Sequence, residues 1–385
     1  MALQTQTHSP DIEKWLSLIR ADGVGPVNFR KLVETLGSIE AVLGASVRQL
    51  TKVDGIGEKT AERIVRSRGR FDAAKELDLA AKHGVWLMCL DDPRYPAALR
   101  QIYDPPPVLY VKGTVQRQDG LAVAVVGSRR CSQYGMEQAN RFAHFLASTG
   151  FTVVSGGARG IDSAAHRGAL SAKGRTIVVQ GCGLAHIFPP ENKPLFEQIA
   201  ENGAIISELP LTYEPLSENF PGRNRIIAGL AMGTLVVEAG LSSGALITAQ
   251  ASLDNNREVM AVPGLIDNPS CAGSHKLIKQ GARLIDSIEE LMDALGCIGQ
   301  DLKGHAVQTA EIAERKAQKT LFDVSELNLS DPERQVYACF DGRPLHLEEL
   351  IARTDLPAGT IYAATVSLQL KGLVKQLAGN TFVRR

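Results

Sequence analysis

The amino-acid sequence predicts an α/β protein with a Rossmann-like, doubly wound and mainly parallel sheet, preceded by an all-helical domain and followed by a winged-helix domain. Three observations lead to this fold class. Apolar residues recur only at helical spacing up to residue 82, short β-branched runs alternate with helical patterns between residues 83 and 296, and three helical patterns precede a hairpin pattern after residue 330. The length of 385 residues is sufficient for two or three domains.

The first predicted domain, residues 1–82, is of the helix-hairpin-helix or SAM-like type. Two short turns, Gly23-Val24-Gly25 and Gly55-Ile56-Gly57, each precede a helical pattern, at 26–36 and 58–66. A Gly-hydrophobic-Gly turn that opens a helix is typical of the helix-hairpin-helix, whose exposed backbone amides can hold a phosphate. A plain packing turn between helices has the same pattern, so the sequence leaves open whether this domain contacts DNA or protein.

The second predicted domain, residues 83–296, carries the sheet. Near-continuous apolar strands separated by helices are typical of a parallel sheet that is covered on both faces. In a doubly wound sheet, ligands bind at the carboxyl ends of the strands, at the point where the strand order reverses. The predicted strands span residues 85–90, 108–111, 122–126, 152–154, 176–180, 204–207, 234–238, 258–262 and 283–285.

Residues 297–330 lose this pattern and carry mixed polar and charged residues, which predicts a linker. The last predicted domain, residues 331–385, is a winged helix, a fold that contacts DNA or protein. Its presumed recognition helix, 357–370, has almost no Lys or Arg before Lys371, which weakens the case for readout of the major groove. The patterns predict helices at 332–340, 347–353 and 357–371 and strands at 374–377 and 382–384.

Composition and charge exclude several function classes. Lys plus Arg and Asp plus Glu both total 42, so contact with nucleic acid requires local clusters of charge rather than a basic surface. No stretch reaches the roughly 18 apolar residues of a membrane span, and the polar N-terminal residues show no signal-peptide pattern, so we expect a cytoplasmic protein without membrane contact. The six cysteines form no Cys-x-x-Cys pair, which argues against a metal site or a disulfide framework.

Two loops at the predicted carboxyl edge of the sheet combine glycine with arginine. Gly127-Ser128-Arg129-Arg130 follows the strand at 122–126, and Ser155-Gly156-Gly157-Ala158-Arg159-Gly160 follows the strand at 152–154. Glycine lets the backbone approach an anion, the N-terminus of the following helix offers free N–H groups, and arginine adds forked donors. Both loops are therefore predicted to bind phosphate. The candidate residues are Gly127, Ser128, Arg129, Arg130, Ser155, Gly156, Gly157 and Arg159.

A third candidate element, Phe220-Pro221-Gly222-Arg223-Asn224-Arg225, lies between a Pro-containing loop at 209–219 and an apolar helical pattern at 226–232. An aromatic ring beside arginines and an amide can stack a base while the arginines pair with backbone phosphates, as in sequence-tolerant binding of single strands. The alternatives are that Phe220 plugs the core beneath the loop and that Arg223 or Arg225 forms a buried ion pair with an acid. The acids considered are Glu208 and Glu238.

Enzymatic alternatives are weaker on the same loops. The first loop lacks the Gly-x-Gly-x-x-Gly of a dinucleotide site, and the chain lacks the P-loop motif Gly-x-x-x-x-Gly-Lys-Ser/Thr, so no cofactor is expected. Gly240-Leu241-Ser242-Ser243-Gly244 matches a hydrolase nucleophile elbow, with Asp267 and His275 downstream in the order of a triad. A Gly/Ser turn at a helix N-terminus serves equally as an anion cradle, which makes Ser243 and Gly244 further nucleic-acid candidates. A nucleotide-processing or esterase-like hydrolase stays open as the alternative function.

Five segments of the chain together resemble the DprA family, also called Smf, of bacterial DNA-processing proteins. The resemblance extends over residues 11–296, and the C-terminal winged helix is similar to one that many members carry. The segments are Val126-Gly127-Ser128-Arg129, Ser155-Gly156-Gly157-Ala158-Arg159-Gly160-Ile161-Asp162, Phe220-Pro221-Gly222-Arg223-Asn224-Arg225-Ile226-Ile227-Ala228-Gly229-Leu230, Ser243-Gly244-Ala245-Leu246-Ile247-Thr248 and Ala261-Val262-Pro263-Gly264.

The resemblance implies a protein that is not an enzyme but binds incoming single-stranded DNA during natural transformation, protects it and assists the loading of the recombinase RecA. It also implies a homodimer formed through the Rossmann-like domain. This chain departs from some members at Ser217, where they have a lysine three residues before the aromatic residue, so we expect weaker affinity and a shallower salt dependence. Carried over residue by residue, the DNA pocket of the family falls on Arg129, Arg159, Phe220, Arg223 and Arg225.

Overall fold

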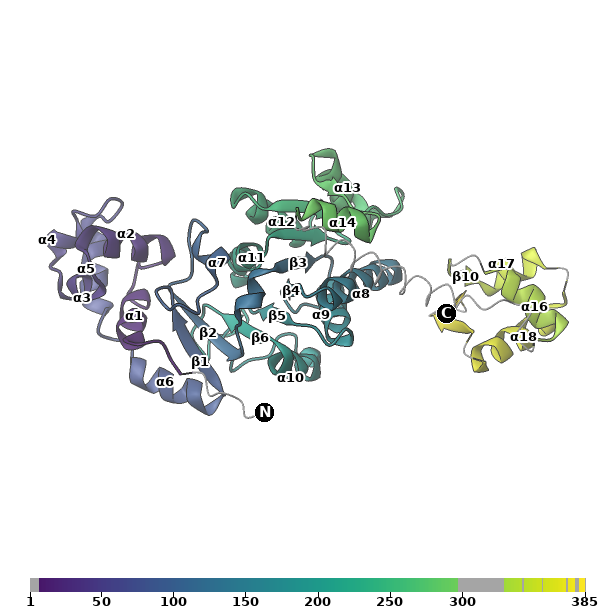
Figure 1. Ribbon diagram of the computed structural model, residues 1–385, viewed down its shortest axis with the longest axis horizontal. Coiled ribbons are helices and arrows are strands. Elements are labelled where there is room, and N and C mark those ends of the chain that lie inside the picture. The colour runs from purple at the N-terminus through teal and green to yellow at the C-terminus, as the bar shows by residue number, and fades with distance from the viewer. Residues whose placement is uncertain are drawn as a thin grey trace. The chain divides into compact units, whose positions relative to one another are not determined.

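The structure is a computed structural model that describes residues 7–296, 329–340, 343–354, 356–371, 373–377 and 381–384. The chain forms two compact units, residues 1–307 and 308–385, whose helices and strands are labelled in Figure 1. The predicted linker at 297–330 lies outside the described residues except for Leu329 and Ser330. No helix of the described residues is long and apolar enough to cross a membrane.

The first unit begins with the predicted all-helical domain. Its helices are α1 (Ile12–Ile19), α2 (Pro26–Leu36), α3 (Ile39–Gly44), α4 (Val47–Leu50), α5 (Glu58–Ser67) and α6 (Ala73–Lys82). The two Gly-hydrophobic-Gly turns directly precede α2 and α5, as the sequence predicted. Gly23 and Gly55 have φ angles of 90° and 83°, in the left-handed region that favours glycine. Val24 and Ile56, which lie between the glycines, are buried and tie each turn to the core of the domain.

A nine-stranded sheet forms the rest of the first unit and confirms the predicted Rossmann-like class. The strands are β1 (Val85–Cys89), β2 (Val108–Gly113), β3 (Ala122–Val126), β4 (Thr152–Ser155), β5 (Thr176–Val179), β6 (Ala204–Ser207), β7 (Gly233–Val236), β8 (Glu258–Ala261) and β9 (Arg283–Leu284). Their order is β1-β2-β6-β5-β4-β3-β7-β8-β9. All neighbours from β6 to β9 in this order are parallel, whereas β2 is antiparallel to both β1 and β6. The sheet is therefore mainly parallel with one antiparallel edge.

Helices and the all-helical domain cover the sheet. The longer helices of this part are α8 (Gln133–Ser148), α9 (Ile161–Ser171), α10 (Lys193–Asn202), α11 (Asn219–Leu230), α12 (Ala245–Asp254), α13 (Ala272–Lys279) and α14 (Ile288–Ala294), and a single turn forms α7 (Ala97–Arg100). Along β1, Val85 and Leu87 belong to one core and Trp86 and Met88 to the other, because successive side chains of a strand point to opposite faces. The first core also contains the all-helical domain and α10, and the second contains α11 and α12.

The strand order reverses at β3. The strands β4, β5 and β6 follow it on one side, and β7, β8 and β9 follow on the other. Because β4 and β7 are the parallel neighbours of β3, the carboxyl ends of these three strands lie at the same edge. This is the position at which a doubly wound sheet binds ligands. The loops that lead from β3 to α8, from β4 to α9 and from β7 to α12 therefore meet at one place.

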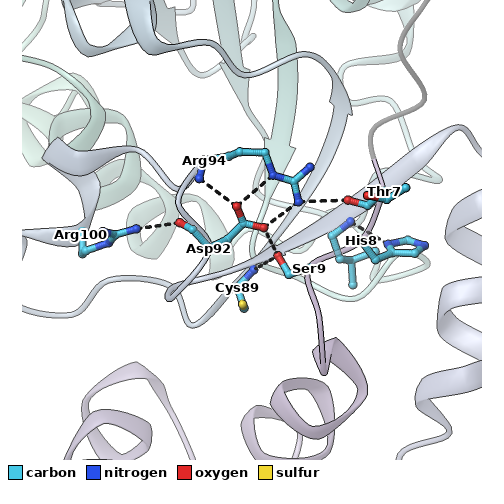
Figure 2. A network of polar contacts seen from close by, with 8 residues as sticks. Thr7, His8, Ser9, Cys89, Asp92, Arg94 and Arg100 are labelled. Carbon is cyan, nitrogen blue, oxygen red and sulfur yellow. Dashed lines mark hydrogen bonds and ion pairs between the residues drawn. The ribbon is translucent and has the colours of Figure 1, made fainter.

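Residues 7–9 fasten the start of the described chain to β1, as Figure 2 shows. The backbone N–H of Ser9 donates to the carbonyl of Leu87 at 3.0 Å, and the N–H of Leu87 donates to His8 Nδ1 at 3.0 Å. The N–H of Cys89 donates to Ser9 Oγ at 3.1 Å. Since β1 is the edge strand of the sheet, these bonds satisfy part of its otherwise unpaired backbone.

Asp92 is the acid at the centre of this network (Figure 2). Its carboxylate accepts hydrogen bonds from Ser9 Oγ and from two nitrogens of the Arg94 guanidinium, at 2.9 and 2.7 Å. The side chain is only 2% exposed. Burial by itself raises the pKa of Asp92, but the hydrogen bonds from Arg94 and Ser9 and the charge of Arg94 outweigh it and lower the pKa to about 2. Asp92 is therefore ionised at neutral pH and holds residues 7–9 against the sheet.

The second unit confirms the predicted winged helix. Its helices are α16 (Asp331–Ala338), α17 (Leu347–Arg353) and α18 (Ala358–Leu370), and its strands are β10 (Leu345–His346), β11 (Val374–Leu377) and β12 (Thr381–Arg384) in the order β10-β12-β11. The sequence did not predict β10, because two residues are too few to show a period. Residues 378–380, between the two predicted strands of the hairpin, lie outside the described residues.

The exposed face of α18, the presumed recognition helix, carries no charge among its described side chains. Tyr362 and Val366 are 55% and 38% exposed, and the other exposed side chains are Ala358, Ala363 and Gln369. Readout of the major groove normally uses basic and amide side chains, and phosphate contacts use cations. This face is better suited to a protein surface than to duplex DNA.

Candidate nucleic-acid interface

A cleft of about 770 Å³ lies where the loops after β3 and β7 meet the start of α11. It coincides with the point where the strand order reverses. The sequence-predicted residues that line it are Gly127, Ser128, Arg129, Arg130, Phe220, Arg223, Asn224, Ser243 and Gly244. Segments from three separate parts of the sequence thus form one concave surface.

The loop after β3 is held by Glu238, a buried acid that follows β7. The backbone N–H of Ser128 donates to the carbonyl of Glu238 at 2.7 Å, and the N–H of Ser132 donates to its carboxylate at 2.9 Å. This fixed loop leaves Arg129 and Arg130 exposed at the cleft. Within the described residues, neither arginine has a carboxylate at ion-pair distance, so both charges are available to a ligand.

Phe220 and Arg223 lie on a helix, which corrects the expectation that the helix starts at 226. The helix α11 begins at Asn219. Pro221 is compatible with this start because it falls in the first turn, where no backbone N–H is needed for helical bonding. The helical spacing of three, four and seven residues then brings Phe220, Arg223, Asn224 and Ile227 to the cleft. Arg225 is off this face.

The ring of Phe220 is half-buried and lines the cleft, so it is not a core plug. The guanidinium carbons of Arg129 and Arg223 lie 5.3 and 5.6 Å from the ring centroid. The ring of Phe188 lies 5.5 Å away and tilted by 39°. Sequence reasoning missed Phe188, which lies nine residues after the end of β5; the only signal for it is an aromatic residue in a loop that follows a parallel strand.

Arg223 forms the floor of the cleft and is only 6% exposed. Its guanidinium donates to the carbonyl oxygens of Gly156, at 2.8 Å, and of Val179. Burial lowers the pKa of Arg223 to about 10, while the nearby Asp162 carboxyl opposes the shift, so Arg223 stays charged at neutral pH. No carboxylate of the described chain lies at ion-pair distance from it. A buried cation with only carbonyl partners favours an anion in the cleft.

The loop after β4 supports the cleft from behind. Ser155 Oγ donates to the carbonyl of Val125 at 2.7 Å, the carbonyl of Gly156 holds Arg223, and a Cβ on Gly157 would lie 2.5 Å from Phe196. The predicted site residues Ser155, Gly156 and Gly157 are therefore packed beneath the cleft rather than lining it.

Arg159 and Arg225 are not among the residues that line the cleft, and each has an acidic partner. Arg159 pairs with Glu191 on the surface. Arg225 pairs with Glu208 at 2.6 Å and with Asp104 at 2.8 Å. The ion pair with Glu208 that the sequence offered as an alternative for Arg225 is therefore present, and it is partly buried.

The Gly240–Gly244 turn faces the cleft but does not meet its predicted triad partners. Ser242, Ser243 and Gly244 line the cleft ahead of α12, and the amide of Asn224 donates to the carbonyl of Gly244 at 3.1 Å. His275 Nε2 contacts the carbonyl of Gly264 at 3.1 Å, and no hydrogen bond joins it to Ser242 in the described part of the chain. The turn thus fits an anion cradle better than a nucleophile. Among the described residues, no group of three His, Cys, Asp or Glu side chains could hold a metal ion.

Comparison with known proteins identifies matches along the whole chain. A family model described as DNA recombination-mediator protein A matches residues 86–296, a SAM-like helix-hairpin-helix tandem matches 16–69, and a DprA winged helix domain matches 322–380. Protein Smf of Synechocystis is 36% identical over 96% of this chain and 98% of its own length. DNA processing protein DprA of Bacillus subtilis is 40% identical over 56% of this chain and 72% of its length. The X-ray structure of DNA processing protein A from Streptococcus pneumoniae aligns with a TM-score of 0.65 and 31% identity, over 75% of this chain and 98% of that one.

Proposed function

This chain belongs to the family of DNA recombination-mediator protein A, and on that premise we propose that it binds single-stranded DNA in the cleft and acts as a mediator rather than an enzyme. The single observation that carries the proposal is the set of side chains that surround Phe220. Two guanidinium groups, those of Arg129 and Arg223, lie 5.3 and 5.6 Å from the centroid of this half-buried ring, and neither has a carboxylate of the described chain at ion-pair distance.

The arrangement matches the chemistry of a single strand. Backbone phosphates require cations, and an unstacked base requires an aromatic ring on which to stack. In a duplex the bases already stack on each other, so a recessed ring such as that of Phe220 offers a duplex nothing. At the Gly/Ser turn the N–H of Ser243 already donates to the carbonyl of Gly240 at 3.0 Å, so it is the backbone amide of Gly244, ahead of α12, that the turn adds for a further phosphate.

The test is the affinity of the full chain for a fluorescent single-stranded oligonucleotide, with duplex competitor and over a series of salt concentrations. Arg129→Ala is expected to weaken binding and flatten the salt dependence, and Phe220→Ala is expected to cost about 1–3 kcal/mol of binding free energy. Arg117→Ala is the matched control. Arg117 is also an exposed arginine, but it precedes the amino end of β3, whereas Arg129 follows the carboxyl end of the same strand.

The proposal stands if single strands are preferred and only the cleft variants lose affinity. Equal binding by the wild type, Arg129→Ala, Phe220→Ala and Arg117→Ala contradicts it. In that case Ser242→Ala would test the hydrolase alternative, since a hydrolase loses turnover with that change.

The family membership supports four finer proposals about this chain. We propose that it protects incoming DNA during natural transformation, that it assists loading of RecA onto the strand, that it acts in the cytoplasm and that it forms a homodimer through the Rossmann-like domain. A homodimer would hold one strand in two clefts, which multiplies affinity through effective concentration.

A further inference from the structure

The all-helical domain forms hydrogen bonds to a segment of the chain that precedes the cleft residues of α11. We call residues 208–213, which follow β6, the anchored segment. Arg20, at the end of α1, donates from its guanidinium to the carbonyl of Glu208 at 2.8 Å. Glu76, a buried acid of α6, accepts the backbone N–H of Leu211 at 2.7 Å. Leu211 is fully buried in the core that contains the all-helical domain.

The anchored segment in turn holds the loop that carries Phe188. The N–H of Gly183 donates to the carbonyl of Tyr213 at 2.8 Å, and the N–H of Ala185 donates to the carbonyl of Leu211 at 2.9 Å. The two segments approach so closely that a Cβ on Gly183 would lie 2.1 Å from the carbonyl oxygen of Pro210. Any shift of the anchored segment must therefore move this loop as well.

The loop at 183–188 and the anchored segment each lead to one of the two aromatic rings in the cleft. The loop at 183–188 ends in Phe188, and the anchored segment continues through 214–218 into α11, whose second residue is Phe220. The two rings lie 5.5 Å apart. Glu208 adds a second tie to α11, because its carboxylate pairs with Arg225 at 2.6 Å while its carbonyl accepts from Arg20. The contacts of the all-helical domain thus reach the anchored segment and the loop at 183–188, and the chain leads from these to the two rings of the cleft.

We propose that Arg20 and Glu76 are positioning residues of the single-strand site: the all-helical domain fixes the anchored segment and thereby holds Phe188 and Phe220 in the arrangement that binds a base. The inference rests on the proposed function of the cleft. Its physical basis is preorganisation, because a site that is already ordered loses less conformational entropy when the ligand binds. Without the hydrogen bonds of Arg20 and Glu76, the connection between β6 and α11 would have to become ordered each time a DNA strand binds.

The first experiment measures single-strand affinity of the full chain for Glu76→Ala, Glu76→Gln and Arg20→Ala. The alanine variants are expected to bind about three- to tenfold more weakly, since one hydrogen bond to a charged group is lost from a site that is formed indirectly. Glu76→Gln keeps an acceptor oxygen for Leu211 and is expected to restore affinity. Arg68→Ala is the matched control, because Arg68 also donates to backbone carbonyls, those of Val42 and Ala45, but remains inside the all-helical domain.

A double-mutant cycle separates positioning from general loss of stability. In the Phe220→Ala background, Glu76→Ala is expected to cost less affinity than in the wild type, because one of the two rings that it helps to position is gone. Circular dichroism at the assay temperature confirms that each variant is folded. The inference is overturned if Glu76→Ala and Arg20→Ala bind like the wild type, if Arg68→Ala weakens binding equally, or if the loss from Glu76→Ala is unchanged without Phe220. If Phe220→Ala alone has no effect, it is the proposed function that fails.

Discussion

At the level of single residues, the arginines around the cleft differ in the partners that they already have. Arg129 and Arg130 are exposed without an acidic partner among the described residues, and Arg223 is held by carbonyl groups. Arg159 and Arg225 are paired with acids. A guanidinium that is already neutralised gains less from a phosphate than one that is not, so equal residue types do not imply equal contributions.

Arg159 provides the sharpest test of this distinction. Arg159→Ala is expected to weaken single-strand affinity less than Arg129→Ala, because Glu191 already offsets its charge. Glu191→Gln removes the acid and is expected to raise affinity and to make the salt dependence steeper by up to about 0.7 in the logarithmic slope, the value for one added phosphate contact. Both effects can be read from anisotropy titrations between low and moderate salt. A loss from Arg159→Ala as large as that from Arg129→Ala would instead show that Arg159 contacts the strand directly.

The sequence predicted residue types of the site better than their partners. Glycine and arginine just after a strand were visible as Gly127 and Arg129, and an aromatic residue close to arginines was visible as Phe220, because these patterns are local. The ion pair of Arg159 with Glu191 joins residues that are distant in sequence, and no pattern along the chain shows it. The pair of Arg225 with Glu208 was considered from the sequence as an alternative to DNA contact, and it is present. The same alternative was considered for Arg223, whose buried guanidinium is held by carbonyl groups instead.

At the level of elements, the predicted strands were found because buried strands have a local apolar signature that does not depend on tertiary contacts. The start of α11 was missed, since Pro221 and Gly222 usually break helices and only their place in the first turn makes them compatible with one. This single correction explains why Phe220 and Arg223 line the cleft and Arg225 does not. The uncharged face of α18 agrees with the sequence-based expectation that the case for major-groove readout is weak.

The attachment of residues 7–9 to β1 makes a prediction about pH at this level (Figure 2). Asp92 has a pKa of about 2 in the folded chain, below the ordinary value of 3.8. Asp92→Asn is therefore expected to cost about 2 kcal/mol of folding stability at pH 7, from a shift of nearly two pKa units. Because the folded pKa is depressed, this contribution is present above pH 4 and is lost as the pH falls from about 4 through 2.

The measurement is denaturant unfolding of the wild type and Asp92→Asn at pH 7 and at pH 3. The difference between the two proteins should shrink at the lower pH, when the wild-type carboxyl begins to take up a proton in the unfolded chain. Asp72→Asn serves as the control. Asp72 is an exposed acid whose carboxylate accepts a hydrogen bond from the backbone N–H of Lys75 at 3.0 Å, so a smaller effect on folding stability is expected. A difference for Asp92→Asn that does not change with pH would contradict the assigned pKa.

At the level of the whole molecule, the predicted domains 1–82 and 83–296 share a core. Trp15 and Leu32 belong to the same hydrophobic cluster as Val178 and Phe196 of the sheet domain. The boundary at 82 was drawn where the periodicity changes, and it remains a prediction about sequence pattern. A shared core is a tertiary property that the pattern of either part does not reveal. It also explains how contacts from the all-helical domain reach the cleft.

The charge of the whole chain sets the expected salt dependence. Lys plus Arg and Asp plus Glu both total 42, so the molecule as a whole does not attract DNA, and the salt effect comes from the cleft. Three cations, Arg129, Arg130 and Arg223, face it. With about 0.7 per phosphate contact on a single strand, the slope of log affinity against log salt is expected to be about −2 per cleft.

Ser217 lines the cleft at the position where some family members have a lysine. Ser217→Lys is expected to strengthen binding and to steepen the slope by about 0.7, since it adds one cation within reach of the strand. Gln118→Lys is the control, because it adds the same charge to an exposed position before the amino end of β3. If the two variants change the slope equally, DNA responds to the net charge of the chain rather than to the cleft. If only Ser217→Lys steepens the slope, single-stranded DNA contacts the cations of the cleft and not the rest of the neutral surface.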